Sequence, residues 1–196
     1  MSAAFSQALI LVVTNLGGIY IGAVIVRFLL QAARADFYNP ICQAIVKATS
    51  PLLNPLRRIV PSWRRLDLAS LVLALILASL ATALMVFSTG NTLPIGTIVS
   101  WALVGLVGLT LNIYFWAMIV TVVASFIAPH SGHPILLIIY QLLQPFYKLA
   151  HRILPPMGGL DFSPLLLMLT IKVIEILVLG PLASGLRVAP QVVIGL

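Results

Sequence analysis

A stretch without any charged residue runs from Leu68 to Pro129, and no other feature constrains the fold as strongly. One membrane-crossing helix takes about 20 apolar residues, so this stretch suits two such helices. The turn-forming cluster Ser-Thr-Gly-Asn-Thr-Leu-Pro at 88–94 separates them. We therefore expect one span near 68–87 and another near 96–127, which is long enough to require tilting in the bilayer.

Two more apolar stretches complete the pattern. Residues 7–26 carry no charge and predict a span near 7–30, and a further span is predicted near 163–182. We expect the first span to be retained rather than cleaved, because positive charge follows it and none precedes it. The predicted fold is an all-α polytopic membrane protein with four transmembrane helices.

The composition agrees with this class. Of the residues, 61% are hydrophobic and only 8% are charged, whereas a soluble domain has about 25% charged residues. This excludes a soluble enzyme fold, a disordered protein and an ordinary nucleic-acid-binding module. The net charge of +7 then favours anionic lipid headgroups as partners. The single Cys42 excludes a disulfide framework within the chain and a thiolate metal cluster, and we expect no cofactor.

The basic residues also predict an orientation. Eight of them lie in the two long loops at 34–67 and 128–162, whereas the opposite side has only Arg187. By the positive-inside rule, both long loops face the cytoplasm and both termini face outward.

A shift of 94 positions aligns the two loops without a gap. The shared residues include Pro40 and Pro134, Pro51 and Pro145, Arg58-Ile59 and Arg152-Ile153, Pro61 and Pro155, and Leu66-Asp67 and Leu160-Asp161. We therefore predict two repeats, at 1–94 and 95–196, each made of a span, a loop and a span. Because both repeats cross the membrane in the same direction, their pseudo-twofold axis should lie along the membrane normal.

Apolar and polar residues alternate at helical spacing within each loop. This predicts amphipathic interfacial helices, with a restart at Ser50-Pro51, where Ser50 would cap the second piece. Two roles are open for these helices. They form either a structural collar at the bilayer surface or a platform that binds lipid or a partner protein.

The loop residues resemble a known family. The pattern of Asn39-Pro40, Pro51, Arg57-Arg58, Pro61 and Asp67 is similar to that of the YggT family of bacterial membrane proteins, also called YlmG. A second copy carries Pro134, Pro145, Arg152, Pro155 and Asp161, with His133 where the first copy has Asn39. The resemblance implies a bacterial inner-membrane location. It also implies links to osmotic tolerance and potassium handling, to cell division, or, in chloroplasts, to cytochrome haem attachment.

Two charged residues lie inside a predicted span. Lys172 and Glu175 are three residues apart, so they share one helix face near mid-membrane. A charge there costs about 2.5–3.5 kcal/mol, which makes such residues functional candidates. The alternatives are a packing contact, an ion or proton site, and a docking face for another membrane protein. Asn112 in the third span, with Thr14 and Asn15 in the first, is expected to hydrogen-bond across helices or to reach the pair.

The remaining polar residues have simpler interpretations. Asp67 and Asp161 precede spans and should cap them, with Arg58 and Arg152 as their expected ion-pair partners. The three histidines, His130, His133 and His151, all fall in the second loop. His130 and His133 are three residues apart and could share a metal or a haem iron, although a solvated interfacial role is the simpler interpretation.

Two function classes follow from these residues. The first is a non-enzymatic membrane protein that assists ion homeostasis under osmotic stress, directly or by modulating a transporter. The second is a scaffold or assembly factor for partner membrane proteins or for self-association. No motif of an enzyme active site is present in the sequence.

Overall fold

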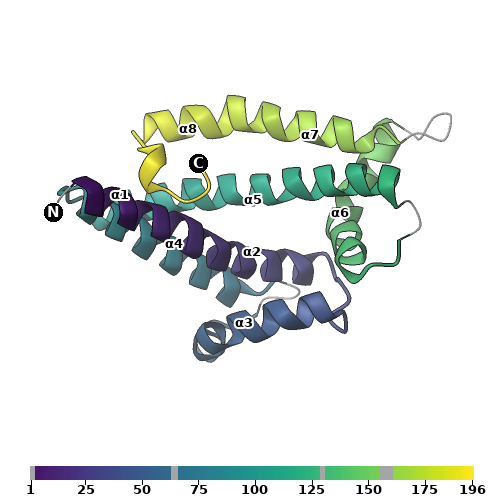
Figure 1. Cartoon of the computed structure of the whole chain (residues 1–196), viewed down its shortest axis with the longest axis horizontal. Coiled ribbons are helices and arrows are strands. Elements are labelled where there is room, and N and C mark those ends of the chain that lie inside the picture. The colour runs from purple at the N-terminus through teal and green to yellow at the C-terminus, as the bar shows by residue number, and fades with distance from the viewer. Residues whose placement is uncertain (1–2, 63–65, 129–130, 155–160) are drawn as a thin grey trace.

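The computed structural model describes residues 3–62, 66–128, 131–154 and 161–196, and this part of the chain folds into helices without strands. Four helical stretches within it are long and apolar enough to cross a membrane: Ala3–Ala32, Leu68–Ser88, Ile95–Ile127 and Ser163–Gly185. These four stretches confirm the predicted all-α class with four transmembrane helices. They lie side by side along the long axis of the molecule (Figure 1).

The first and fourth spans each contain a wide turn. The first consists of α1 (Ala3–Val12), the π-helical turn η1 (Val13–Gly17) and α2 (Gly18–Ala32). The second and third are α4 (Leu68–Ser88) and α5 (Ile95–Ile127). The fourth consists of α7 (Ser163–Ile174), the π-helical turn η2 (Glu175–Leu179) and α8 (Gly180–Gly185).

The loops between the spans hold α3 (Pro40–Arg57) and α6 (Pro134–Ile153). Helix α6 lies at the end of the molecule away from the N-terminus, and α3 runs beneath the spans from that side to the middle (Figure 1). Helix α3 buries Cys42, Thr49 and Leu53 against the spans, which is the spacing of a helix with one inward face. A position in the bilayer interface stays a prediction for both helices.

The predicted break of the first loop helix at Ser50-Pro51 is wrong. Helix α3 continues through Pro51 and Pro55, and α6 continues through Pro145. The hydroxyl of Ser50 does not cap a new helix but donates to the carbonyl of Val46 at 2.6 Å, and Thr49 donates to Ile45 at 2.7 Å. Pro51 has no N–H to donate to the carbonyl of Lys47, four residues earlier. The two hydroxyls bond the preceding carbonyls, of Ile45 and Val46, so they do not replace this N–H, and α3 continues through Pro51 without that backbone hydrogen bond.

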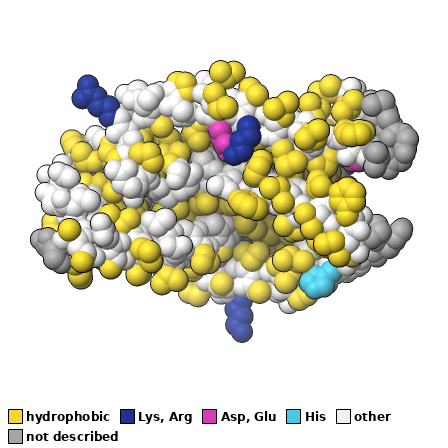
Figure 2. All heavy atoms as spheres, turned by 45° about the horizontal axis from the view of Figure 1, so that its top comes forward, with side chains coloured by type: hydrophobic (Ala, Val, Ile, Leu, Met, Phe, Trp, Pro, Cys, Tyr) yellow, Lys and Arg dark blue, Asp and Glu magenta, His cyan; other side chains and the backbone are white. Residues whose placement is uncertain are grey.

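The core runs through α2, α4 and α5. One cluster joins Val24, Leu30, Leu73 and Ala74 with Leu142 of α6. Helix α7 packs mainly against α5 and α6 and leaves a long apolar side exposed. Hydrophobic side chains therefore cover most of the visible face, and charged ones are few (Figure 2).

The C-terminal residues fold back into the bundle. Val192, Val193 and Ile194 are buried against Ile21 and Trp101, and η3 (Pro190–Val192) forms the bend before them. The indole Nε1 of Trp101 donates to the carbonyl of Leu186 at 3.0 Å. This tail lies at the end of the bundle opposite α6 (Figure 1).

Candidate functional sites

Lys172 and Glu175 form an ion pair inside the fourth span. The Lys172 Nζ lies 2.7 Å from Glu175 Oε2 and 4.4 Å from the centre of the Phe115 ring on α5. Their side chains are 48% and 25% exposed, so the pair lies at the edge of the bundle rather than in its core. Lys172 is nine residues beyond Ser163, which at 1.5 Å per residue places it about 14 Å along the helix, near mid-membrane.

A cavity of about 310 Å³ adjoins this pair. Asn112 of α5 lines it together with Lys172 and Glu175, and the tail residues Gly195 and Leu196 form part of its wall. The structure therefore brings together the three residues of the predicted intramembrane site. Thr14 and Asn15 do not line this cavity, since Thr14 contacts Met85 Sδ at 3.5 Å and Asn15 donates to Leu11 of its own helix at 2.8 Å.

The π-helical turn η2 begins at Glu175. Pro181 follows it and has no N–H to donate, while its ring would crowd the carbonyl four residues earlier. A widened turn before the proline relieves this conflict and changes the direction of the side chains within it. The local sequence thus sets how Glu175 faces the cavity.

The family-like loop motif has a capping role in both repeats. Asn39 accepts a hydrogen bond from the N–H of Ile41 at 2.9 Å and caps α3, and its amide donates to the carbonyl of Pro134 at 2.8 Å. His133 takes the same capping position at α6, where its Nδ1 accepts from Ile135 at 3.4 Å. The prolines that follow, Pro40 and Pro134, occupy the first turn, where a missing N–H costs nothing.

Asp67 and Asp161 also have equivalent partners, although these are not the predicted ones. Asp67 pairs with Arg57 rather than Arg58, and Asp161 pairs with His151 at 3.1 Å rather than with Arg152. Arg57 and His151 are themselves 94 positions apart. Each predicted partner is one position later in the sequence than the observed one. On a helix, one position changes the direction of a side chain by about 100°.

The two carboxyl groups differ in their surroundings. Asp67 is fully buried, and Ser70 donates to its Oδ2 at 2.7 Å. Burial raises the pKa of Asp67, but hydrogen bonds from Arg57 and Ser70 and the charge of Arg57 outweigh it and hold the pKa below its usual value. Burial likewise raises the pKa of Asp161, and hydrogen bonding by Ser163 and His151 brings it below the usual value. Asp161 accepts from the N–H of Ser163 at 2.9 Å, as expected for a residue that caps α7, whereas the Asp67 side chain makes no capping bond to the α4 backbone.

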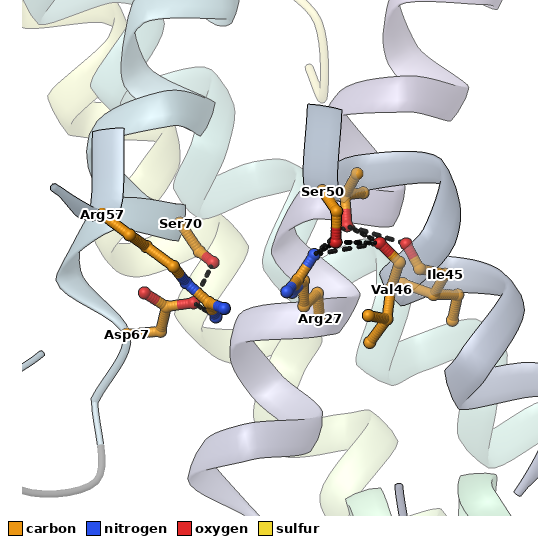
Figure 3. Close-up of polar contacts among 8 residues, drawn as sticks. Arg27, Ile45, Val46, Ser50, Arg57, Asp67 and Ser70 are labelled. Carbon is orange, nitrogen blue, oxygen red and sulfur yellow. Dashed lines mark hydrogen bonds and ion pairs between the residues drawn. The ribbon is translucent and has the colours of Figure 1, made fainter. Parts of the chain in front are cut away.

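Arg27 is a functional candidate that the sequence did not reveal. In the sequence, Arg27 only marks the end of the uncharged stretch at 7–26. In the structure it is buried, with 4% of the residue's surface exposed. Its Nη1 donates to Thr49 Oγ1 at 2.6 Å, to Ser50 Oγ at 3.2 Å and to the Val46 carbonyl at 3.2 Å (Figure 3). The helical periodicity of α2 places Arg27 on the same face as the apolar residue Val24, three positions earlier. This spacing is the one feature of the sequence that could have indicated that Arg27 is buried.

The remaining motif residues are less informative. Pro61 and Arg58 are exposed. Pro155 and His130 lie outside the described residues. Among the residues that are described, no group of three or more His, Cys, Asp or Glu side chains has the geometry of a metal site.

Comparisons with known proteins support the repeat. The model of the CCB3/YggT family matches residues 6–88 and, a second time, residues 100–182. An uncharacterized protein of Pseudomonas aeruginosa is 41% identical over 91% of this chain and 92% of its own length. The uncharacterized protein YggT of Escherichia coli K12 is 36% identical over 80% of this chain and 81% of its own length. No solved structure matches.

Proposed function

The chain belongs to the CCB3/YggT family, and from this premise we propose that it is a non-enzymatic protein of the bacterial inner membrane that assists ion homeostasis. The observation that carries the proposal is the cavity between α5 and the fourth span, into whose lining Asn112, Lys172 and Glu175 bring an amide and an ion pair. Intramembrane charges are costly and are functional-site candidates by default, and they often belong to ion or proton pathways.

The proposed mechanism is a competition for the Glu175 carboxylate. Lys172 neutralises Glu175 in the present arrangement, and the aromatic face of Phe115 offers Lys172 a second favourable contact. A monovalent cation in the cavity would take the carboxylate and the Asn112 amide oxygen as ligands while Lys172 moves away. Four spans with few polar residues suit a wide aqueous pore poorly, so the protein would either move ions slowly or sense them for a transporter.

The test is cation flux into proteoliposomes that contain the full chain. Glu175→Gln removes the charged ligand and should abolish potassium-dependent flux, while Asp36→Asn, an equivalent change on an exposed loop residue, should leave it unchanged. The double variant Lys172→Met with Glu175→Leu separates the alternatives, because it leaves an apolar helix without an unpaired charge. A double variant that folds and keeps its flux would show that the pair only fixes packing.

A second candidate function is a scaffold for partner membrane proteins. It is favoured by the fourth span, whose outer side exposes Leu165, Leu169, Ile176 and Leu177. Purification in mild detergent tests it: a stoichiometric membrane partner that is lost after Leu169→Arg and Leu177→Arg would support this function over ion handling.

A further inference from the structure

A second cavity lies beside α2 and α3, far from the Lys172 pair. Its volume is about 450 Å³, and its lining residues are Arg27, Gln31, Phe37, Val46, Arg57 and Ser62. Small-molecule sites measure about 300–1,000 Å³. Of the lining side chains, four can donate hydrogen bonds and none is acidic.

Arg27 supplies a fixed positive charge to this cavity. Its Nη1 is held by three neutral oxygens of α3, and no carboxylate of the described residues lies within ion-pair distance of it. Neutral acceptors orient a guanidinium but do not cancel its charge. Asp67 acts on Arg27 only from beyond ion-pair distance, since it is bonded to Arg57. A buried charge with no counter-ion in contact is unfavourable, and an anionic ligand would relieve it.

Arg57 adds a second guanidinium. It is paired with Asp67, whereas Arg27 contacts no carboxylate of the described residues, so the cavity keeps a net positive charge. Figure 3 shows the Arg27 and Arg57 guanidinium groups on neighbouring sides of the same space. Gln31 and Ser62 add neutral polar groups, while Phe37 and Val46 supply an apolar wall.

The second repeat has an equivalent cavity without this charge. It measures about 600 Å³, and Thr121 and Tyr140 line it at the positions 94 residues after Arg27 and Val46. Asp161 lines it as well, and no lysine or arginine does. The fold therefore forms such a cavity with or without arginines, so the positive charge is particular to the first repeat.

We propose that the cavity of the first repeat binds a phosphate group, and that the phosphate belongs to the headgroup of an anionic phospholipid. Paired guanidinium groups match the oxygens of a phosphate in geometry and charge. Arg27 lies five residues before the end of α2, about 8 Å inside the end of the span, where headgroup and acyl chain meet.

Titration of the full chain in neutral detergent micelles tests the proposal. The probes are phosphatidylglycerol, zwitterionic phosphatidylcholine and inorganic phosphate, and thermal protection reports their binding. We expect phosphatidylglycerol to bind best, and Arg27→Gln to weaken it by about tenfold or more, since a charge-assisted hydrogen bond is lost. Arg58→Gln removes the same charge from an exposed residue outside the cavity and should change the affinity less than twofold.

Gln31→Glu keeps every hydrogen bond of Arg27 and places a negative charge on the cavity wall. It should also weaken phosphatidylglycerol by about tenfold, which a folding defect at Arg27 would not explain. Equal lipid binding by the parent and both cavity variants would overturn the site. Protection by inorganic phosphate alone, with no further effect of lipid, would overturn the lipid as the source of the phosphate. Because Glu175 is not part of this cavity, Glu175→Gln should keep lipid binding whatever its effect on ion flux.

Discussion

Asp67 and Asp161 occupy equivalent positions of the two repeats, yet they differ in burial. Asp67 is fully buried beside Arg57, whereas the Asp161 side chain is 41% exposed beside His151. A buried carboxylate that loses its partner keeps an uncompensated charge away from water. An exposed carboxylate is solvated by water instead. Loss of the partner should therefore cost more stability at Asp67 than at Asp161.

Removal of the cationic partner should therefore have unequal effects. Arg57→Leu should lower the free energy of unfolding by about 3 kcal/mol, at the low end for broken buried pairs because Arg57 is itself partly exposed. His151→Leu should lower it by less than about 1 kcal/mol. Denaturant unfolding in detergent micelles measures both values, and equal losses would contradict the difference in burial.

The same pair predicts a loss of stability in acid. The folded state holds the pKa of Asp67 below its usual value, so its contribution is complete above the unfolded pKa of about 3.9. The contribution disappears as the pH falls through the lower folded pKa. Unfolding midpoints between pH 7 and pH 2 should therefore fall more steeply for the parent than for Asp67→Asn, which cannot titrate at this position. Parallel curves would contradict the prediction.

At this scale the sequence predicted which residue types matter better than which ones meet. The spacing of 94 identified Asp67 and Asp161 correctly as equivalent, but helix phase at the end of α3 selected Arg57 over Arg58. Arg27 escaped notice because a charge at the end of an apolar stretch normally reaches toward water. Only the packing of α3 against α2 shows that it turns inward.

Among the elements, the spans were easier to predict than the loop helices and the tail. Bilayer thickness fixes the length of a span, so an uncharged stretch is a strong signal. A proline is a weaker signal, because a helix can continue past it with one backbone hydrogen bond fewer, as α3 does at Pro51 and Pro55. The tail gave no signal, since its burial depends on close approach to α5.

That approach requires glycines on both sides. A Cβ on Gly108 would collide with the carbonyl of Gly195, and one on Gly105 would lie within 2.5 Å of the carbonyl of Ile194. Gly195 itself has φ +99°, a conformation that other residues rarely adopt. The tail therefore packs against the face of α5 that carries Gly105 and Gly108. It also forms part of the wall of the Lys172 cavity.

Gly108→Ala should displace the tail without unfolding the spans. Val193 is 3% exposed. A cysteine at this position should react with a maleimide about tenfold faster in the Gly108→Ala variant, because the free energy needed to detach the tail from α5 is lower. The measurement needs a Cys42→Ser background. Gly22→Ala is the matched control, since nothing lies within 4 Å of a Cβ there, and equal labelling of Gly108→Ala and Gly22→Ala would show that the tail does not depend on Gly108.

For the whole molecule, the sequence predicted four spans and two repeats but not how the spans pack. Their apolar surfaces look alike in sequence because lipid and protein contacts are both apolar. The edge position of α7 against α5 and α6 follows from side-chain shapes instead. The distribution of basic residues nonetheless predicts one property of the whole molecule, which is the direction in which it inserts into the membrane.

Both proline-bearing loops should face the cytoplasm, because they carry eight basic residues against Arg187 alone on the other side. Single cysteines at Ser62 and Asn91, both exposed, test this in a Cys42→Ser background with a membrane-impermeant maleimide on intact cells. Cys42 is removed for clarity of the assay, although burial raises the pKa of its thiol and should slow its reaction. We expect labelling at Asn91 from outside and at Ser62 only after the membrane is opened. The reverse pattern would invert the topology and would place the Arg27 cavity against the outer leaflet instead of the inner one.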